Sequence, residues 1–259
     1  VQLRNANGRI SRLDDPDPVP RSAYNGPLIV LVNRYSASAS EIFAAAIQDY
    51  ERGVVVGQQT YGKGTVQNLY ALDQYVRRNQ DELGQLTLTI GKYYRVTGES
   101  TQNRGVIPDI ELPSYIDIDN TGESSRDTAL PWDKIKPSRY KKNQPMEDSI
   151  NQLKELHTER RKTDPELIFL LRDIEESSRY RKQTTVSLNL NKRMSEREAR
   201  EERKEAIDKI RIKADNNDVA EEENENRDIN LNETAAIATD LVKLNNSDSK
   251  SNQMAKRVE

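Results

Sequence analysis

The strongest constraint on the fold is a segment with helical spacing placed between two short apolar runs. Residues 28–32 and 54–57 are rich in Leu, Ile and Val and are bounded by turn residues, as is typical of buried strands. Between them, apolar residues recur on one helical face over Glu41–Asp49, namely Ile42, Phe43, Ala46, Ile47 and Tyr50. A strand, a helix and a strand with tight connections form a βαβ unit, so the sequence predicts an α/β fold.

The flanking segments extend this prediction. Gln85–Tyr94 has the composition of a further strand, and Val106–Ile110 that of a strand end. The opening stretch to Gly26 contains the run Asp-Asp-Pro-Asp-Pro-Val-Pro and is predicted to be a loop.

Composition changes near residue 114, after which the chain is polar and helix-prone. Pro131-Trp132 lies in a linker, where Trp132 is expected to anchor the segment on the core. Helical patterns follow at about 146–161, 165–181, 194–213 and 232–244. Asn216–Asn230 is acidic and low in complexity, and the last dozen residues are expected to be disordered. We therefore expect a core over 1–114 and a helical domain with a linker and a disordered tail over 115–259.

Charge and composition exclude several classes of function. The net charge is -3 with acids and bases interspersed, so no basic face for nucleic acid is expected. There is no cysteine, which excludes disulfides and thiolate catalysis. No run approaches the roughly 18 apolar residues of a membrane span. Because the chain opens in mid-pattern at Val1, we expect a C-terminal fragment of a longer protein, whose signal peptide would lie outside it.

The candidate nucleophile lies where the first strand turns into the helix. Ser36, Ser38 and Ser40 stand there among small residues, near N–H groups that the helix leaves unpaired. Those amides and the helix dipole favour the negative charge that develops when a serine attacks a carbonyl. Ser38 followed by Glu41 is also a capping box, which needs no catalysis. Both interpretations remain open from these residues alone.

A serine nucleophile needs a base, and the sequence offers two types of candidate. The single histidine, His157, lies in a charged segment and is predicted to be a surface helix residue. Lysine is the alternative base, and Lys63 lies between Gly62 and Gly64, which permit close backbone approach. To work near neutral pH a lysine needs its pKa lowered by roughly 3 units, or about 4 kcal/mol. An ordinary turn lysine is the other interpretation of Lys63.

The same segment partly matches a phosphate-binding loop. Gly57 to Lys63 has the required glycine and lysine spacing, but Gly64 replaces the Ser or Thr that holds magnesium. The residues that follow, Thr65 to Gln67, are typical of a strand and provide no helix N-terminus for phosphate. Nucleotide binding is therefore disfavoured.

Two linked motifs give a family resemblance. Ser-Ala-Ser-Ala-Ser-Glu-Ile-Phe, followed by Gly-Lys-Gly-Thr-Val-Gln with its lysine 25 positions after Ser38, resembles the tail-specific (C-terminal processing) serine peptidases, in particular the larger bacterial type. The resemblance implies that Ser38 is the nucleophile, Lys63 its base, and Gln67 a residue that orients the lysine. Further segments resemble the end of the peptidase core and the helical region after it: 93–96, 100–102, 105–110 and 129–133.

The resemblance also implies a fold and a mechanism. It predicts the C-terminal part of a crotonase/Clp-protease-like peptidase core, followed by an α-helical C-terminal domain. Ser38 would form an acyl-enzyme without ATP or any cofactor, and the amide of Ala39 would be one oxyanion donor. A second donor and a PDZ domain would lie upstream of this sequence.

The resemblance further implies protein or peptide substrates with nonpolar C-termini, an adaptor protein as a further partner, and a periplasmic location, associated with the inner membrane. The alternative is a catalytically silent scaffold in which Ser38 only caps a helix and the helical region binds a partner.

Overall fold

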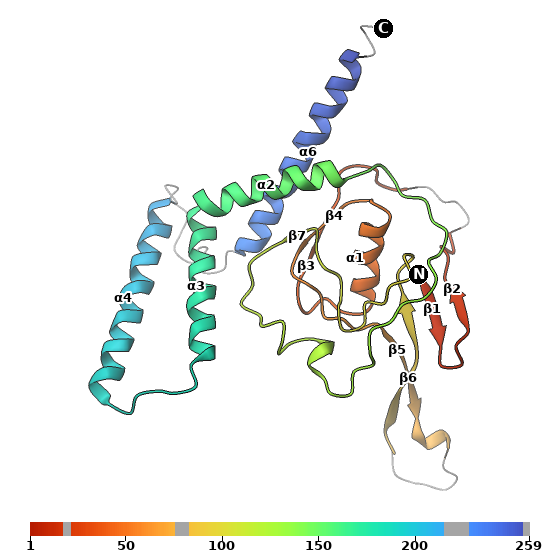
Figure 1. Cartoon of the computed structure of the whole chain (residues 1–259), viewed down its shortest axis with the longest axis horizontal. Helices are drawn as coiled ribbons and strands as arrows, with labels where there is room; N and C mark the ends of the chain where they lie inside the picture. The colour runs from red at the N-terminus through yellow and green to blue at the C-terminus, as the bar shows by residue number, and fades with distance from the viewer. Residues whose placement is uncertain (18–21, 76–82, 215–227, 256–259) are drawn as a thin grey trace. The chain divides into compact units, whose positions relative to one another are not determined.

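The computed structural model describes residues 1–17, 22–75, 83–214 and 228–255. The chain divides into two compact units (Figure 1). The first combines Val1–Glu111 with Ile116–Glu147, and the second combines Leu112–Tyr115 with Asp148–Glu259. Each unit is described by itself below.

The core of the first unit is the predicted βαβ arrangement. Strands β3 (Ile29–Val32), β4 (Val54–Gly57) and β7 (Ile110–Glu111) form a parallel sheet in the order β3-β4-β7, and helix α1 (Ala39–Asp49) connects β3 to β4. Apolar side chains fill the space between the helix and the sheet: Val32, Ala44, Ala45, Ile47, Val55 and Val106. The predicted strand end at 106–110 is shorter than expected, because only Ile110 and Glu111 pair with β4.

The buried face of α1 differs from the predicted one. Phe43 is 55% exposed, whereas Glu41 and Asp49 are buried together with Ala44, Ala45 and Ile47. Small alanines let the helix lie close to the strands, and the two carboxylates find hydrogen-bond partners inside the unit. The spacing rule assumed that acidic residues face water, so it placed the face incorrectly.

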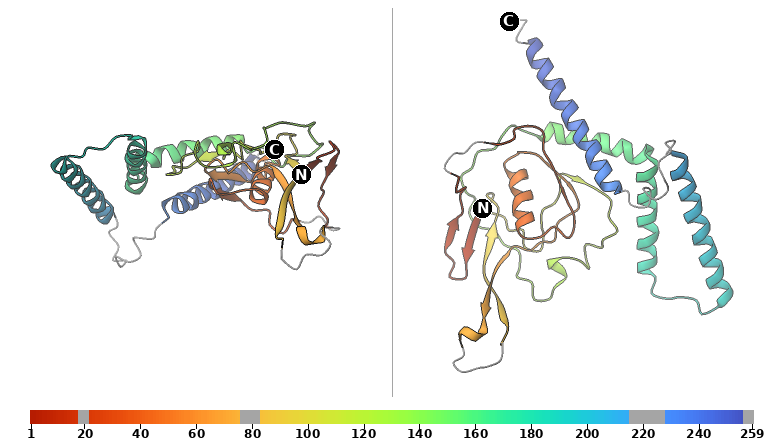
Figure 2. Two further views of the ribbon diagram at one scale, coloured as in Figure 1. Left: turned by 90° about the horizontal axis from the view of Figure 1, so that it is seen from below. Right: turned by 180° about the vertical axis from the view of Figure 1, so that it is seen from behind.

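A second, antiparallel sheet has the order β2-β1-β6-β5. Its strands are β1 (Gln2–Asn5), β2 (Ile10–Arg12), β5 (Thr65–Ala71) and β6 (Gln85–Tyr94). The prediction that the opening stretch is a loop was therefore wrong for β1 and β2, which are short strands: β2 pairs with β1, and β1 pairs with β6. The outer part of the β5–β6 hairpin extends from the unit, and its residues 85–89 are exposed (Figure 1, Figure 2). By contrast, β6 is buried from Gly91 to Tyr94.

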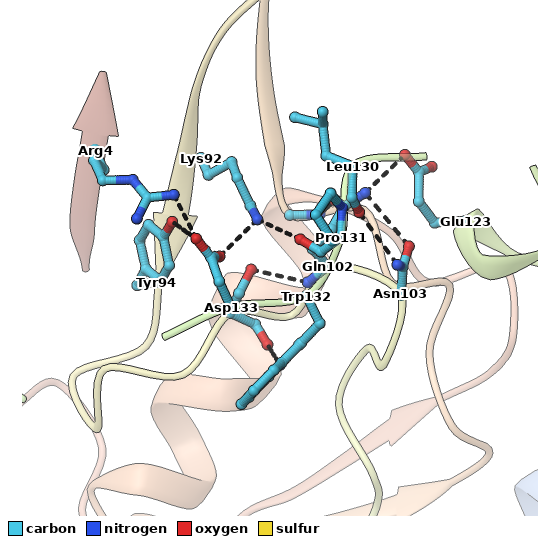
Figure 3. A network of polar contacts seen from close by, with 12 residues as sticks. Arg4, Lys92, Tyr94, Gln102, Asn103, Glu123, Leu130, Pro131, Trp132 and Asp133 are labelled. Carbon is cyan, nitrogen blue, oxygen red and sulfur yellow. Dashed lines mark hydrogen bonds and ion pairs between the residues drawn. The ribbon is translucent and has the colours of Figure 1, made fainter. Parts of the chain in front are cut away.

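The segment after Ile116 returns to the antiparallel sheet. Asp133 accepts hydrogen bonds from Arg4 (2.5 Å), Lys92 (2.6 Å) and Tyr94 (3.1 Å), as Figure 3 shows. Burial opposes ionisation of Asp133, but the hydrogen bonds from Lys92 and Arg4 outweigh it and hold its pKa below the ordinary value. The indole N–H of Trp132 donates to the carbonyl of Ser100 at 2.8 Å, which confirms Trp132 as an anchor.

The second unit is helical. Its helices are α2 (Glu147–Thr163), α3 (Pro165–Lys182), α4 (Leu190–Ala214) and α6 (Ile229–Ala255). They confirm the four predicted helical patterns, with ends that agree within four residues except that α6 continues to Ala255. Of the tail predicted to be disordered, residues 248–255 lie in α6 and residues 256–259 lie outside the described residues. Residues 216–227 of the low-complexity segment also lie outside them. Within the described residues, no helix is both long and apolar enough to cross a bilayer.

His157 is not the surface residue that the sequence predicted. It is 4% exposed, and its Nδ1 lies 2.7 Å from a carboxylate oxygen of Glu233, which is also buried. Arg160 forms an ion pair with the same carboxylate at 2.8 Å. The charged neighbours of His157 in the sequence suggested a solvated helix, but the carboxylate on α6 provides the polar partner that allows histidine to be buried.

The ion pair between Asp49 and Arg95 joins the end of α1 to the residue after β6. The contact is bidentate, with a shortest distance of 2.6 Å, and the Asp49 side chain is 5% exposed. We predict that Asp49→Ala lowers the free energy of unfolding by about 3 kcal/mol, because it leaves a partly buried guanidinium without its partner. Denaturant unfolding followed by the fluorescence of Trp132, which lies in the same unit, measures this. Asp14→Ala breaks an exposed pair with Arg12 and should cost less than about 1 kcal/mol. Equal losses in the two variants would contradict the prediction.

A pH dependence follows for the second unit. Burial raises the pKa of Glu233, but hydrogen bonds from His157 and Arg160 more than offset this, so its pKa lies below the ordinary value of 4.5. The stability that this carboxylate provides should be present above about pH 4.5 and should be lost as the pH falls through the lower folded-state pKa. We predict that the stability difference between wild type and Glu233→Gln shrinks as the pH falls below 4.5, measured by urea unfolding of helical circular dichroism. A difference independent of pH would contradict it.

Candidate active site

Ser38 lies at the turn from β3 into α1. It is the N-cap residue and has φ 56° and ψ -111°, a backbone conformation that residues other than glycine rarely adopt. Ser38 and Glu41 occupy the positions of a capping box, and the Ser38 amide donates to a Glu41 carboxylate oxygen at 2.8 Å. The Ser38 hydroxyl lies near the Glu41 amide but forms no regular capping hydrogen bond. Strained residues are enriched at active sites, so this turn is a candidate for chemistry.

Lys63 lies in a loop that packs tightly against its surroundings. Gly62 has φ +94°, and a Cβ there would lie 2.9 Å from the backbone of Asn103; a Cβ at Gly64 would lie 2.7 Å from the backbone of Gln102. The close approach predicted for the two glycines is therefore confirmed. Strand β5 follows directly at Thr65, so Lys63 does not precede a helix as the lysine of a phosphate-binding loop does.

The carboxylate of Glu41 connects the turn at Ser38 (the serine turn) to the loop over residues 60–63 (the lysine loop). Glu41 is 0% exposed and accepts four hydrogen bonds. The amides of Ser38 and Lys63 donate to Oε2 at 2.8 and 2.9 Å, while the Thr60 hydroxyl and the Gly62 amide donate to Oε1 at 2.6 and 2.7 Å. Burial raises the pKa of Glu41, and these hydrogen bonds oppose the shift. Because all four partners act as donors, the arrangement suits the ionised form.

Tyr93 connects the same two segments from β6. Its hydroxyl lies 3.1 Å from the carbonyl oxygen of Ser38 and 2.8 Å from that of Lys63. The Tyr93 amide donates to the carbonyl of Gly64 at 3.0 Å, so the strand also holds the lysine loop through its backbone. The backbones of Ser38 and Lys63 are thus brought together, although 25 positions separate them in the sequence.

The other two predicted site residues, Ala39 and Gln67, lie on α1 and β5. Ala39 is the first residue of α1 and is exposed, and amides in the first turn of a helix have no partner within it. Gln67 is exposed on β5, directly after a register shift between Val66 and Gln67. His157, which the sequence did not favour as the base, belongs to the second unit and is paired with Glu233.

Sequence reasoning missed three residues that shape the site. Glu41 was considered only as half of a capping box, and Tyr93 only as part of a motif. Arg34 was not considered. It is 1% exposed, and its guanidinium donates to the carbonyl of Thr60 and to the carbonyls of Ile118 and Thr121, in the segment after Ile116. The Ser-x-x-Glu spacing was the available signal for Glu41, but nothing local pointed to the long-range partners of Tyr93 and Arg34.

Comparison with known proteins places both parts of the chain. Residues 1–112 match the family model of Peptidase family S41, and residues 116–243 match that of the C-terminal domain of tail specific protease. The tail-specific protease of Haemophilus influenzae is 40% identical over 262 residues, which is 98% of this chain and 37% of that protein. A carboxy-terminal-processing protease of Bartonella bacilliformis is 46% identical over 84 residues, or 32% of this chain and 18% of that protein.

A solved structure, the photosystem II D1 C-terminal processing protease, matches at 36% identity with a TM-score of 0.29, covering 36% of this chain and 22% of that chain. The chain spans little more than a third of the length of the Haemophilus protein. Two adjacent family matches and a relative aligned over nearly the whole chain lead to one assignment. The chain belongs to peptidase family S41, in the group that carries the C-terminal domain of tail-specific proteases.

Proposed function

We propose that the protein is a serine endopeptidase in which Ser38 is the nucleophile and Lys63 its general base. The observation that carries this proposal is the joint attachment of the Ser38 and Lys63 backbones to Glu41 and Tyr93. A nucleophile and a base must be held in a fixed relation for proton transfer, and these contacts provide one. The family match supports the class of reaction.

The proposed reaction runs in two steps. Neutral Lys63 accepts the hydroxyl proton of Ser38 as the serine oxygen attacks the scissile carbonyl carbon. The C–N bond then breaks, and Lys63 gives this proton to the leaving amine. An ester then joins Ser38 to the acyl fragment. Water attacks this ester with Lys63 again as the base, which releases a carboxylate product and restores Ser38.

The start of α1 suits the charge that develops. Attack on the carbonyl places a negative oxygen near the amide of Ala39, where the helix dipole and an N–H without an intrahelical partner favour it. The proposal assigns the second oxyanion donor to a part of the protein outside this sequence. It assigns to Gln67 the role of orienting Lys63 when substrate is bound.

The finer properties follow the resemblance to tail-specific proteases. We propose that the first unit is the C-terminal part of a crotonase/Clp-protease-like core, and that cleavage needs neither ATP nor a cofactor. Substrates would be proteins with nonpolar C-terminal tails, recognised through a PDZ domain outside this sequence and with an adaptor protein as a further partner. The site of action would be the periplasm, at or near the inner membrane.

We predict that Ser38→Ala in the full natural protein abolishes cleavage, with a loss of at least about 1,000-fold. The assay incubates a reporter protein that ends in a nonpolar tail without ATP and identifies the products by mass spectrometry. A fluorophosphonate probe should label Ser38 in the wild type. Ser40→Ala is the matched control, because Ser40 lies two residues away in the first turn of α1, and it should keep activity and labelling. Cleavage by Ser38→Ala at the wild-type rate would mean that Ser38 only caps the helix.

Lys63→Arg tests the base separately from its charge. A guanidinium remains protonated and cannot accept the serine proton, so we predict a loss of roughly 100- to 10,000-fold in kcat. Substrate affinity should be the same for Ser38→Ala and for the double variant Ser38→Ala/Lys63→Arg. Lys136→Arg replaces an exposed lysine in the same unit and should behave as wild type. A Lys63→Arg enzyme with full activity would refute the assignment.

A further inference from the structure

Two side chains hold both the N–H and the C=O groups of Ser38 and Lys63. One carboxylate oxygen of Glu41 accepts from both amides, and one phenol oxygen of Tyr93 lies within hydrogen-bond distance of both carbonyls. Neither segment is joined to the other by a regular sheet or helix ladder at these residues. The nearest direct backbone contact joins the Tyr61 amide to the Ser36 carbonyl at 2.9 Å, two residues away from each, so these two side chains fix the spacing at Ser38 and Lys63 themselves.

Tyr93 is well suited to this task. It is 3% exposed, and β6 fixes its backbone by pairing with β1. Burial and the nearby charge of Glu41 raise the pKa of Tyr93, so the phenol keeps its proton over the working pH range. Its hydroxyl hydrogen is shared between the carbonyls of Ser38 and Lys63, at 3.1 and 2.8 Å. The hydroxyl therefore bridges the two segments.

The neighbouring residue shows that a buried tyrosine on this strand need not have such a role. Tyr94 is 0% exposed, and its hydroxyl donates to Asp133, on the network of Figure 3. Burial raises the pKa of Tyr94 to about 12, so it too stays protonated. Successive side chains point to opposite faces of a strand. The two tyrosines are thus similarly buried, but only the Tyr93 hydroxyl contacts the Ser38 and Lys63 backbones, whereas the Tyr94 hydroxyl contacts Asp133.

We infer that Tyr93 is a positioning residue for the proposed dyad. Its hydroxyl sets the distance between the Ser38 and Lys63 backbones on the carbonyl side, as Glu41 does on the amide side. This inference rests on the proposed function. It assigns Tyr93 no contact with substrate: its effect is exerted through the placement of the nucleophile relative to the base.

The experiment compares Tyr93→Phe with Tyr94→Phe in the full natural protein. Each change removes one buried hydroxyl from the same strand and keeps the ring. Tyr93→Phe should lower kcat roughly 10- to 100-fold with KM nearly unchanged, because a small misplacement of reacting groups slows the chemical step. Fluorophosphonate labelling of Ser38 should slow by a similar factor. Tyr94→Phe should keep kcat and the labelling rate.

Thermal unfolding of both variants separates positioning from stability. Similar melting temperatures in the two variants, with a rate loss confined to Tyr93→Phe, would support the inference. Equal kcat in wild type and Tyr93→Phe would overturn it and leave the dyad intact. An equal loss of kcat in Tyr93→Phe and Tyr94→Phe that follows a fall in melting temperature would also overturn it, because the effect would then be structural. Failure of wild type to cleave or to label at Ser38 would refute the proposed function itself.

Discussion

The buried carboxylate of Glu41 is the interaction on which the rest of the first unit depends. A buried acid is costly unless hydrogen bonds satisfy it, and Glu41 receives four. Those donors come from the serine turn and from the loop over residues 60–63, so the cost of burial is offset only when both segments are in place. The hydroxyl of Thr60 extends the same chain, because it accepts from the amide of Val106 at 2.7 Å. One carboxylate thus makes the turn, the loop and the approach to β7 mutually dependent.

The sequence predicted the parts of this unit that follow from local periodicity. The β3–α1–β4 unit could be predicted because apolar runs and helical spacing are readable within a few residues. The short strands β1 and β2 could not, because β1 pairs with β6, about 90 positions away, and β2 lies on the other edge of β1. The serine and lysine motifs could be located for a different reason, which is their resemblance to a family. The buried positions of Glu41 and His157 were missed because both depend on partners distant in the sequence.

The site combines strain with support from all sides. Ser38 has a positive φ, and such a conformation persists only where the surroundings hold it. Here the support comes from its own helix, through the capping-box carboxylate, and from β6, through Tyr93. The lysine loop is held by Tyr93 and Glu41 as well, and by the guanidinium of Arg34 at the Thr60 carbonyl. In the proposed site, the relation between Ser38 and Lys63 would thus be set mostly through their backbone groups.

The segment 116–147 changes where the peptidase module should be considered to end. The family match stops at Leu112, yet Arg34 finds two of its carbonyl acceptors at Ile118 and Thr121, and Arg4, Lys92 and Tyr94 share Asp133. A polypeptide cut near residue 112 would expose a guanidinium buried beside the lysine loop and would leave two cations without their common anion. A gene fusion that exchanged only the helical part would have to keep the same segment, so the portable unit is longer than sequence similarity alone suggests.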